Sequence, residues 1–358
     1  MRFTRSARLV LGASLFALIA AACGGATPEG GGGDGGDGAA SDFRVGLALD
    51  VGGIGDKSFN DAANAGLQQA ISEGIIAEEN TEFLEANATG SNRDENIVNL
   101  ADQGFDLIIG VGFAFSEGIA EIAPDYPDQN FAIVDGFANA VNDQLTNVAD
   151  LTFEEHEGSY LVGIAAGMTT EANTVGFLGG QEGTGLIEKF QAGYEAGVQS
   201  VCPDCEILVE YIGDSTQAFV DPTRGEALSA SMYDDGADVI YHAAGQSGLG
   251  LFAAAADTGQ WAIGVDSDQY EVLADNPEQQ QTILTSMLKR VDTAVYDAIS
   301  QASSGAFRAG FQVFGMAEEG VDYADSNPAV PDDVRAAMDE AKAAIISGEI
   351  TVPEEPQG

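Results

Sequence analysis

Short apolar runs and segments of helical periodicity alternate along the chain from residue 42 onward. Apolar runs closed by glycine or aspartate, at 44–49, 106–111 and 130–134, predict buried strands. The segment 59–71 has apolar positions at helical spacing and follows Ser58, a residue type that favours the N-cap of a helix. Strands separated by helices predict right-handed βαβ units and parallel sheets.

The same alternation starts again after residue 154, which predicts a second lobe similar to the first. Strands are expected at 82–86, 174–178, 206–211, 238–241, 261–265, 282–287 and 311–314. Helices are expected at 92–103, 115–123, 155–168, 186–199, 224–234, 250–257, 291–300 and 331–347. We expect a first lobe of 42–149 plus 285–306 and a second of 150–284 plus 307–358, because a tail of this kind can cross back between lobes.

The first 41 residues predict a targeting signal followed by a tether. Residues 1–22 carry three arginines and then an apolar run that ends in small residues, which is typical of a secretory signal peptide. The run Ala-Ala-Ala-Cys-Gly around Cys23 resembles a bacterial lipobox, so we expect cleavage before Cys23 and lipidation of that residue. The glycine-rich stretch 23–41 predicts a flexible tether. The expected location is therefore the cell envelope, on the outer face of the cytoplasmic membrane, held by lipid alone.

The charge of the chain excludes several partners. It has 58 Asp and Glu against 13 Lys and Arg, a formal net charge of -45, and 45% hydrophobic residues that can form a core. Such a field repels phosphate backbones and anionic membrane surfaces, so we expect no nucleic-acid partner. Dense carboxylates also keep salt-adapted proteins hydrated, and we interpret the acidity as a sign of a saline habitat.

Cysteine and histidine are too scarce for a Cys/His zinc cage. The chain has three cysteines and two histidines. Cys202 and Cys205, in Cys-Pro-Asp-Cys, predict a local disulfide in a protein outside the membrane. We expect no metal site and no cofactor.

Candidate ligand-binding residues follow the expected strands, because ligands of open parallel sheets bind beyond the carboxyl ends of the strands. These positions are Asp50, 110–113, Asp135, 179–180, 241–245 and 266–269, with Phe59 and Asn60 opening the helix after the first strand. Carboxylates accept hydrogen bonds from hydroxyl groups and aromatic rings stack on flat rings, so the set suits a neutral polyol that carries a planar ring. Walker, Gly-x-Ser-x-Gly and His-Glu-x-x-His motifs are absent from the sequence.

Each candidate also has a structural interpretation. Asp50 and Asp135 could cap helices or form turns, and Phe59 could pack beneath the first helix. Tyr241 and His242 alternate along one strand, so one of them should face the core.

Ordered stretches of the chain resemble the basic membrane lipoprotein (BMP, PnrA-like) family, the substrate-binding proteins of ABC importers. The opening signature is Gly-Ile-Gly-Asp-Lys-Ser-Phe-Asn at 53–60, preceded by the strand and Asp at 45–50. Further matching stretches are 104–113, 126–135, 160–166, 175–180, 190–197, 236–240, 262–269 and 285–290.

The resemblance implies a type I periplasmic-binding-protein fold, an α/β architecture of two Rossmann-like lobes with parallel sheets and a three-segment hinge. It implies capture of a nucleoside, in particular a purine nucleoside, between the lobes for delivery to a permease and its ATPase. Phe59 would stack on the base, Asp50 and Asn60 would bond the polar edges of the ligand, and Asp135, Asp266 and Lys289 would line the ribose or base side. The strand-end positions Phe113 and Gly245 complete the expected site, with Tyr241 as the second stacking aromatic and Phe219 as the reserve.

We therefore expect a monomeric binding protein and not an enzyme. Two alternatives stay open: a surface sensor for another flat polyol such as riboflavin or for a sugar, and an extracellular nucleoside hydrolase.

Overall fold

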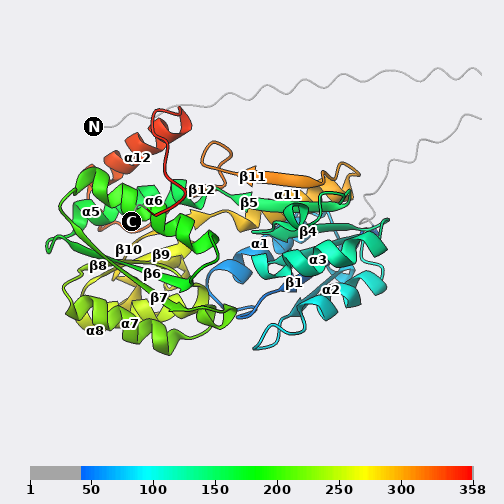
Figure 1. Cartoon of the computed structure of the whole chain (residues 1–358), viewed down its shortest axis with the longest axis horizontal. Helices are drawn as coiled ribbons and strands as arrows, with labels where there is room; N and C mark the ends of the chain where they lie inside the picture. The colour runs from blue at the N-terminus through cyan, green and yellow to red at the C-terminus, as the bar shows by residue number, and fades with distance from the viewer. Residues whose placement is uncertain (1–41, 357–358) are drawn as a thin grey trace, which may run out of the picture. The chain divides into compact units, whose positions relative to one another are not determined.

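The computed structural model describes residues 42–356, all of which belong to one compact unit. They form two six-stranded sheets covered by helices (Figure 1). In spatial order, the first sheet contains β11 (Gly310–Phe314), β5 (Val148–Phe153), β4 (Asn130–Val134), β3 (Leu107–Val111), β1 (Val45–Leu49) and β2 (Thr81–Glu85). The second contains β12 (Val321–Tyr323), β10 (Ile283–Lys289), β9 (Trp261–Asp266), β8 (Val239–Ala243), β6 (Thr174–Gln181) and β7 (Glu206–Gly213).

All neighbouring strands run parallel except β10 and β12, which are antiparallel. Central strands such as β1 and β3 are buried along their whole length because helices cover both faces, which explains their continuous apolar runs. The edge strands β2 and β11 alternate between partly buried and exposed residues. The expected parallel α/β fold is confirmed.

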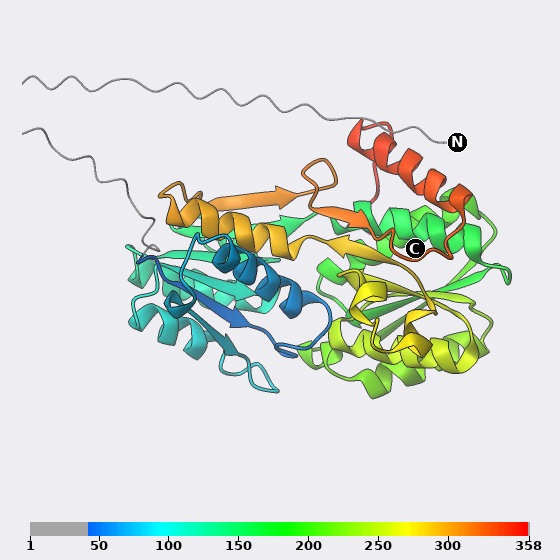
Figure 2. The ribbon, with the colours of Figure 1, turned by 180° about the vertical axis from the view of Figure 1, so that it is seen from behind.

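Helices of the first lobe cover its sheet from two sides. They are α1 (Phe59–Ser72), α2 (Arg93–Asp102), α3 (Ser116–Ile122), α4 (Ala138–Val141) and α11 (Val291–Ser303), with short 3₁₀ turns η1 (Glu78–Asn80), η2 (Phe113–Phe115) and η3 (Ala123–Asp125). Buried side chains of α1 and α11 share one core with one face of the sheet, and those of α2 and α3 form a second core on the other face. Figure 2 shows α11 lying along α1 and β11 running beside β5.

Helices of the second lobe also cover their sheet from two sides. They are α5 (Glu155–Thr169), α6 (Leu186–Val201), α7 (Pro222–Asp234), α8 (Leu249–Thr258), α9 (Gln269–Val272), α10 (Pro277–Gln280) and α12 (Asp332–Ile346), with η4 (Thr216–Phe219) and η5 (Gly245–Gly248). Helices α5 and α6 approach so closely that a Cβ at Gly197 would lie 2.1 Å from the carbonyl oxygen of Tyr160. Glycine is required there because no side chain fits between the two backbones.

The chain crosses between the sheets three times within residues 42–356: after β5, after β10, and between β11 and β12. This matches the expected three-segment hinge. The strand pairing differs from the expected lobe division, because β10 lies in the second sheet and β11 in the first. We therefore place residues 290–314 with the first lobe and the rest of the tail with the second.

Two strands escaped the sequence analysis. β5 was hidden because Asp150 interrupts its apolar run. That buried carboxylate accepts hydrogen bonds from the backbone N–H groups of Ala138 and Asn139 and so fixes the start of α4. The other strand, β12, has only three residues and carries no periodic signal.

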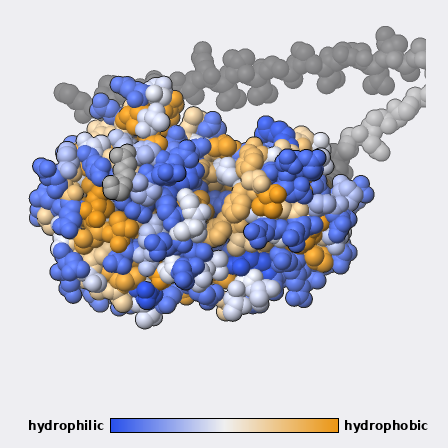
Figure 3. Space-filling model, in the orientation of Figure 1, coloured by the Kyte–Doolittle hydropathy of each residue, from blue (hydrophilic) through white to orange (hydrophobic). Residues whose placement is uncertain are grey.

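Cys202 and Cys205 form a disulfide with 5.4 Å between their Cα atoms. None of the helices in the described part of the chain has the length and apolar character that a membrane span requires. The face shown in Figure 3 is largely hydrophilic, and apolar residues gather there in separate patches. The expected signal peptide, the lipidated Cys23 and the tether lie outside the described residues.

Candidate functional site

A cavity lies between the two sheets at the carboxyl ends of their strands. Its empty volume, including the space open to solvent, is about 670 Å³, within the range of small-molecule sites. The first lobe contributes Asp50, Val51, Asp56, Phe59, Asn60, Gly112, Phe113 and Asp135. The second lobe contributes Leu186, Ile187, Phe190, Phe219, Ala243, Ala244, Gly245, Gln246, Val265, Asp266 and Lys289.

The loop between β1 and α1 is held by the buried carboxylate of Asp56. It accepts hydrogen bonds from the backbone N–H groups of Ser58 (3.0 Å), Asn60 (2.8 Å) and Asp61 (3.1 Å). These are the donors that a helix start leaves without partners, so Asp56 fixes the beginning of α1 and with it the ring of Phe59. Asp56 lies in the motif that carries the family resemblance, but nothing in the sequence indicated this role.

Asn60 lines the cavity, but its side-chain amide is engaged within the protein. Its Oδ1 accepts from the backbone N–H of Asp50 (3.1 Å), and its Nδ2 donates to Asp56 Oδ2 (2.9 Å). The amide therefore shapes the loop, and any bond to a ligand would have to be made in addition to these.

Asp50 is paired with Arg93, a residue of α2 that the sequence analysis did not select. The Arg93 guanidinium lies 2.7 Å (Nε) and 2.5 Å (Nη2) from Asp50 Oδ1. Burial raises the pKa of Asp50, and the charge of Arg93 opposes this rise. The pairing orients one carboxylate oxygen and stabilises the ionised form in the wall of the cavity.

Lys289, the last residue of β10, is the cation at the centre of the site. Its buried ammonium lies 2.6 Å from Asp135 Oδ1 and 3.0 Å from Glu155 Oε1. The rings of Phe59, Phe153 and Phe190 surround it, with centroids at 5.4, 5.0 and 5.3 Å. Burial alone would lower the pKa of Lys289, but the neighbouring carboxylates raise it, so the side chain stays charged.

Asp135 and Asp266 occupy equivalent positions in the two lobes, at the ends of β4 and β9. Both have left-handed backbones, with φ of 59° and 63°, a conformation that non-glycine residues rarely adopt and that concentrates at functional sites. Burial raises the pKa of each to about 6, against the opposing charge of Lys289. The main cause is desolvation by burial, which the ammonium of Lys289 does not fully offset.

Four phenylalanine rings line the cavity, from Phe59, Phe113, Phe190 and Phe219. Phe113 and Phe219 come from different lobes and meet edge to face, with centroids 6.4 Å apart and an interplanar angle of 68°. Rings from both lobes therefore offer surfaces on which a planar group could stack.

Tyr241 corrects the sequence prediction. It is fully buried, its ring packs against those of Phe177 and Tyr194, and its hydroxyl lies 3.2 Å from Ser159 Oγ. Tyr241 belongs to the core beneath the cavity because its β8 side chain faces α5 and α6. The reserve choice, Phe219, lines the cavity instead, as do Phe113 and Gly245.

Leu186, Ile187 and Phe190 were also missed. They open the helix that follows β6, so the strand-end rule could have found them had it been extended from Gly180 across the next turn.

Hydrogen bonds connect the lobes beside the cavity. Ser58 Oγ donates to Asp266 Oδ2, and Gln269 Nε2 donates to the carbonyl oxygen of Lys57 at 3.1 Å. The cavity is thus enclosed by two lobes that contact each other directly at its edge.

The family model described as "ABC transporter substrate-binding protein PnrA-like" matches residues 43–356, which is nearly all of the described chain. A CD4+ T-cell-stimulating antigen of Listeria monocytogenes is 37% identical over 328 residues, covering 88% of this chain and 89% of that protein. The ABC transporter nucleoside-binding protein BmpA of Lactococcus lactis is 32% identical, with 87% and 90% covered. Among solved structures, an ABC transporter solute-binding protein from Aeropyrum pernix K1 superposes with a TM-score of 0.74 at 30% identity, covering 88% of this chain and 94% of that one.

Proposed function

Because the chain belongs to the PnrA-like family of ABC transporter substrate-binding proteins, we propose that its cavity captures a nucleoside, in particular a purine nucleoside, for delivery to a permease and its ATPase. Proteins of this family bind solutes and are not enzymes. The observation that carries the proposal is the composition of the cavity, in which four phenylalanine rings and the Asp135–Lys289–Asp266 cluster meet between the lobes.

The two parts of this lining match the two halves of a nucleoside. Phenylalanine rings favour a flat base, and buried carboxylates accept hydrogen bonds from ribose hydroxyls. A deoxy analogue would leave a buried carboxylate without a partner, so the site should discriminate against it. The name of the Lactococcus relative supports the same ligand class.

The N-terminal sequence supports a lipid anchor at Cys23 after removal of residues 1–22. An anchored monomer would keep the cavity close to a permease on the outer face of the cytoplasmic membrane.

A thermal-shift screen tests the proposal. Purine and pyrimidine nucleosides, riboflavin and free sugars are each added to the purified protein, and the midpoint of thermal unfolding is recorded. Since a ligand at 100 times its Kd adds about 2.7 kcal/mol to the free energy of unfolding, purine nucleosides should raise the midpoint by several degrees. A rise with riboflavin or sugars alone would overturn the proposed ligand class.

A further inference from the structure

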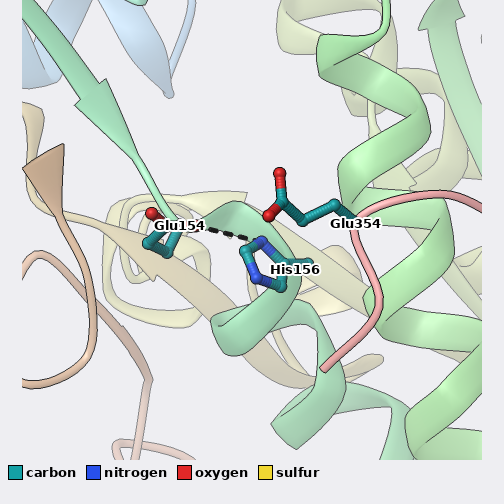
Figure 4. Close-up of side chains that lie close together, drawn as sticks. All are labelled: Glu154, His156 and Glu354. Carbon is teal, nitrogen blue, oxygen red and sulfur yellow. Dashed lines mark ion pairs between the residues drawn. The ribbon is translucent and has the colours of Figure 1, made fainter. Parts of the chain in front are cut away.

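Glu154, His156 and Glu354 come together away from the residues that line the ligand cavity (Figure 4). Glu154 directly follows β5, His156 lies in the first turn of α5, and Glu354 belongs to the C-terminal segment after α12. One ligand atom from each, an imidazole nitrogen and two carboxylate oxygens, lies within 4.8 Å of the others. Folding alone creates this cluster, because Glu354 is distant in sequence from the other two.

The imidazole of His156 points to a missing partner. The residue is 6% exposed, and its Nδ1 atom has no hydrogen-bond partner among residues 42–356. The carboxylate of Glu154 is 3.5 Å away. A buried polar atom without a partner costs free energy, and such atoms are rare in folded proteins. A ligand that accepts the Nδ1 lone pair would remove this cost.

We propose that Glu154, His156 and Glu354 bind a divalent transition-metal ion of the zinc class. Neutral imidazole and carboxylate oxygen are both ligands of Zn²⁺, with bonds of about 2.0–2.2 Å. Atoms within 4.8 Å of one another can reach such distances by small side-chain rotations, and Glu354 is exposed. Mg²⁺ and Ca²⁺ prefer sites made only of oxygen ligands, so the imidazole favours a transition metal over either of them.

Lys189 carries a nearby charge that opposes a cation. Its ammonium lies 3.9 Å from Glu154 Oε2 but only 3.1 Å from Glu155 Oε2, and it donates a hydrogen bond to the carbonyl oxygen of Phe153. Its charge is therefore mainly engaged by Glu155. On the other side, Glu157 and Glu318 line a second cavity together with Glu154, so the field around the cluster is negative in sum.

The cluster lies on the hinge. The backbone N–H of Glu154 donates to the carbonyl oxygen of Phe314 at 3.2 Å, which joins the first and third crossings between the lobes. A bound metal would tie the C-terminal segment to this point through Glu354. The sequence analysis expected no metal because it counted cysteines and histidines and could not foresee that a distant glutamate completes the set.

Calorimetric titration of the full, chelator-treated chain with ZnCl₂ tests the proposal, in buffer with 10-fold excess Mg²⁺ over Zn²⁺ to saturate weak acidic sites. We expect one saturable Zn²⁺ site that Glu354→Gln weakens at least tenfold. Glu355→Gln is the matched control, since Glu355 is the exposed neighbour that does not belong to the cluster. It should bind Zn²⁺ as the unchanged chain does.

A second readout keeps the test independent of nucleoside binding. Zn²⁺ should raise the midpoint of thermal unfolding of the chain and of Glu355→Gln, and should raise that of Glu354→Gln much less. Absence of saturable binding, or equal affinity in Glu354→Gln and Glu355→Gln, would overturn the proposal, because the metal would then bind elsewhere or only to diffuse acidity.

Discussion

Asp135 and Asp266 show at the residue scale how the fold prepares a site. Each ends a parallel strand, each has a left-handed backbone, and each is buried beside Lys289 with a pKa of about 6. The ammonium groups of Lys289 and Lys189 are two positive charges against the three carboxylates of Asp135, Asp266 and Glu155. Hydroxyl donors from a ligand would supply the compensation that the protein lacks, which makes this cluster the chemical centre of the proposed site.

Removing the charge of Asp135 should weaken nucleoside binding. We expect Asp135→Asn to raise the Kd at least tenfold, because a hydrogen bond to a charged group contributes roughly 1.5–3 kcal/mol. Isothermal titration calorimetry measures this, with Asp128→Asn, an exposed acidic residue outside the cavity, as the control. An unchanged Kd in Asp135→Asn would remove Asp135 from the site.

The same residues predict a pH dependence of stability. Since the folded protein binds these protons more tightly than an unfolded chain, whose Asp pKa is near 3.8, the contribution of Asp135 and Asp266 to the free energy of unfolding should fall as the pH rises from 4 through 6. Burial lowers the pKa of His242 to about 4, so that residue contributes in the opposite direction. The pKa of Glu155 is lowered, so its protonation affects the free energy of unfolding only at lower pH. Lys289 stays charged throughout this range. Urea unfolding between pH 4 and 7 should show a less negative slope of the free energy of unfolding against pH in Asp266→Asn than in the unchanged chain. An equally steep slope in that variant would contradict the assignment.

At the scale of elements, apolar periodicity predicted most of the strands and helices. The run 130–134 became β4 without change, and the helix expected at 59–71 became α1. Strand ends located Asp50, Phe113 and Asp135. Contacts between elements could not be predicted in the same way. In a strand that is buried on both faces, polar and apolar residues do not alternate, so the sequence does not show on which face of the sheet a given side chain lies. Tyr241 was misplaced for this reason.

The contact between α5 and α6 gives a prediction at this scale. Gly197→Ala should lower the free energy of unfolding by about 1–3 kcal/mol, since the added methyl would collide with backbone atoms of α5. The control is Gly213→Ala, at the end of β7. Apart from the adjacent residues, the atom nearest to the added methyl there would be 3.6 Å away. Chemical denaturation compares the two. Similar stabilities would show that the helices can separate at little cost.

At the scale of the whole chain, the two main features are its large negative charge and the hinge between its lobes. A formal charge of -45 creates repulsion that salt screens, since the Debye length falls from about 10 Å at 0.1 M to about 3 Å at 1 M. The lobe similarity follows from the repeated βαβ pattern, and the three crossings were implied by the family resemblance. The cross-lobe bonds of Ser58 and Gln269 arise only from the folded arrangement.

Stability should therefore rise with salt. We expect the midpoint of thermal unfolding to increase by several degrees between 0.1 M and 2 M KCl, with most of the gain below 1 M where screening changes fastest. Differential scanning calorimetry measures the midpoint. A midpoint independent of salt would refute the interpretation of the acidity as a salt adaptation.

Nucleoside capture by the cavity is tested most directly by calorimetric titration of the purified chain with inosine, with free hypoxanthine and with ribose. We expect one inosine per chain and binding at least a hundredfold tighter than that of either half, because the phenylalanine rings and the Asp135–Lys289–Asp266 cluster must both be engaged. No binding of inosine, or ribose bound as tightly as inosine, would contradict it.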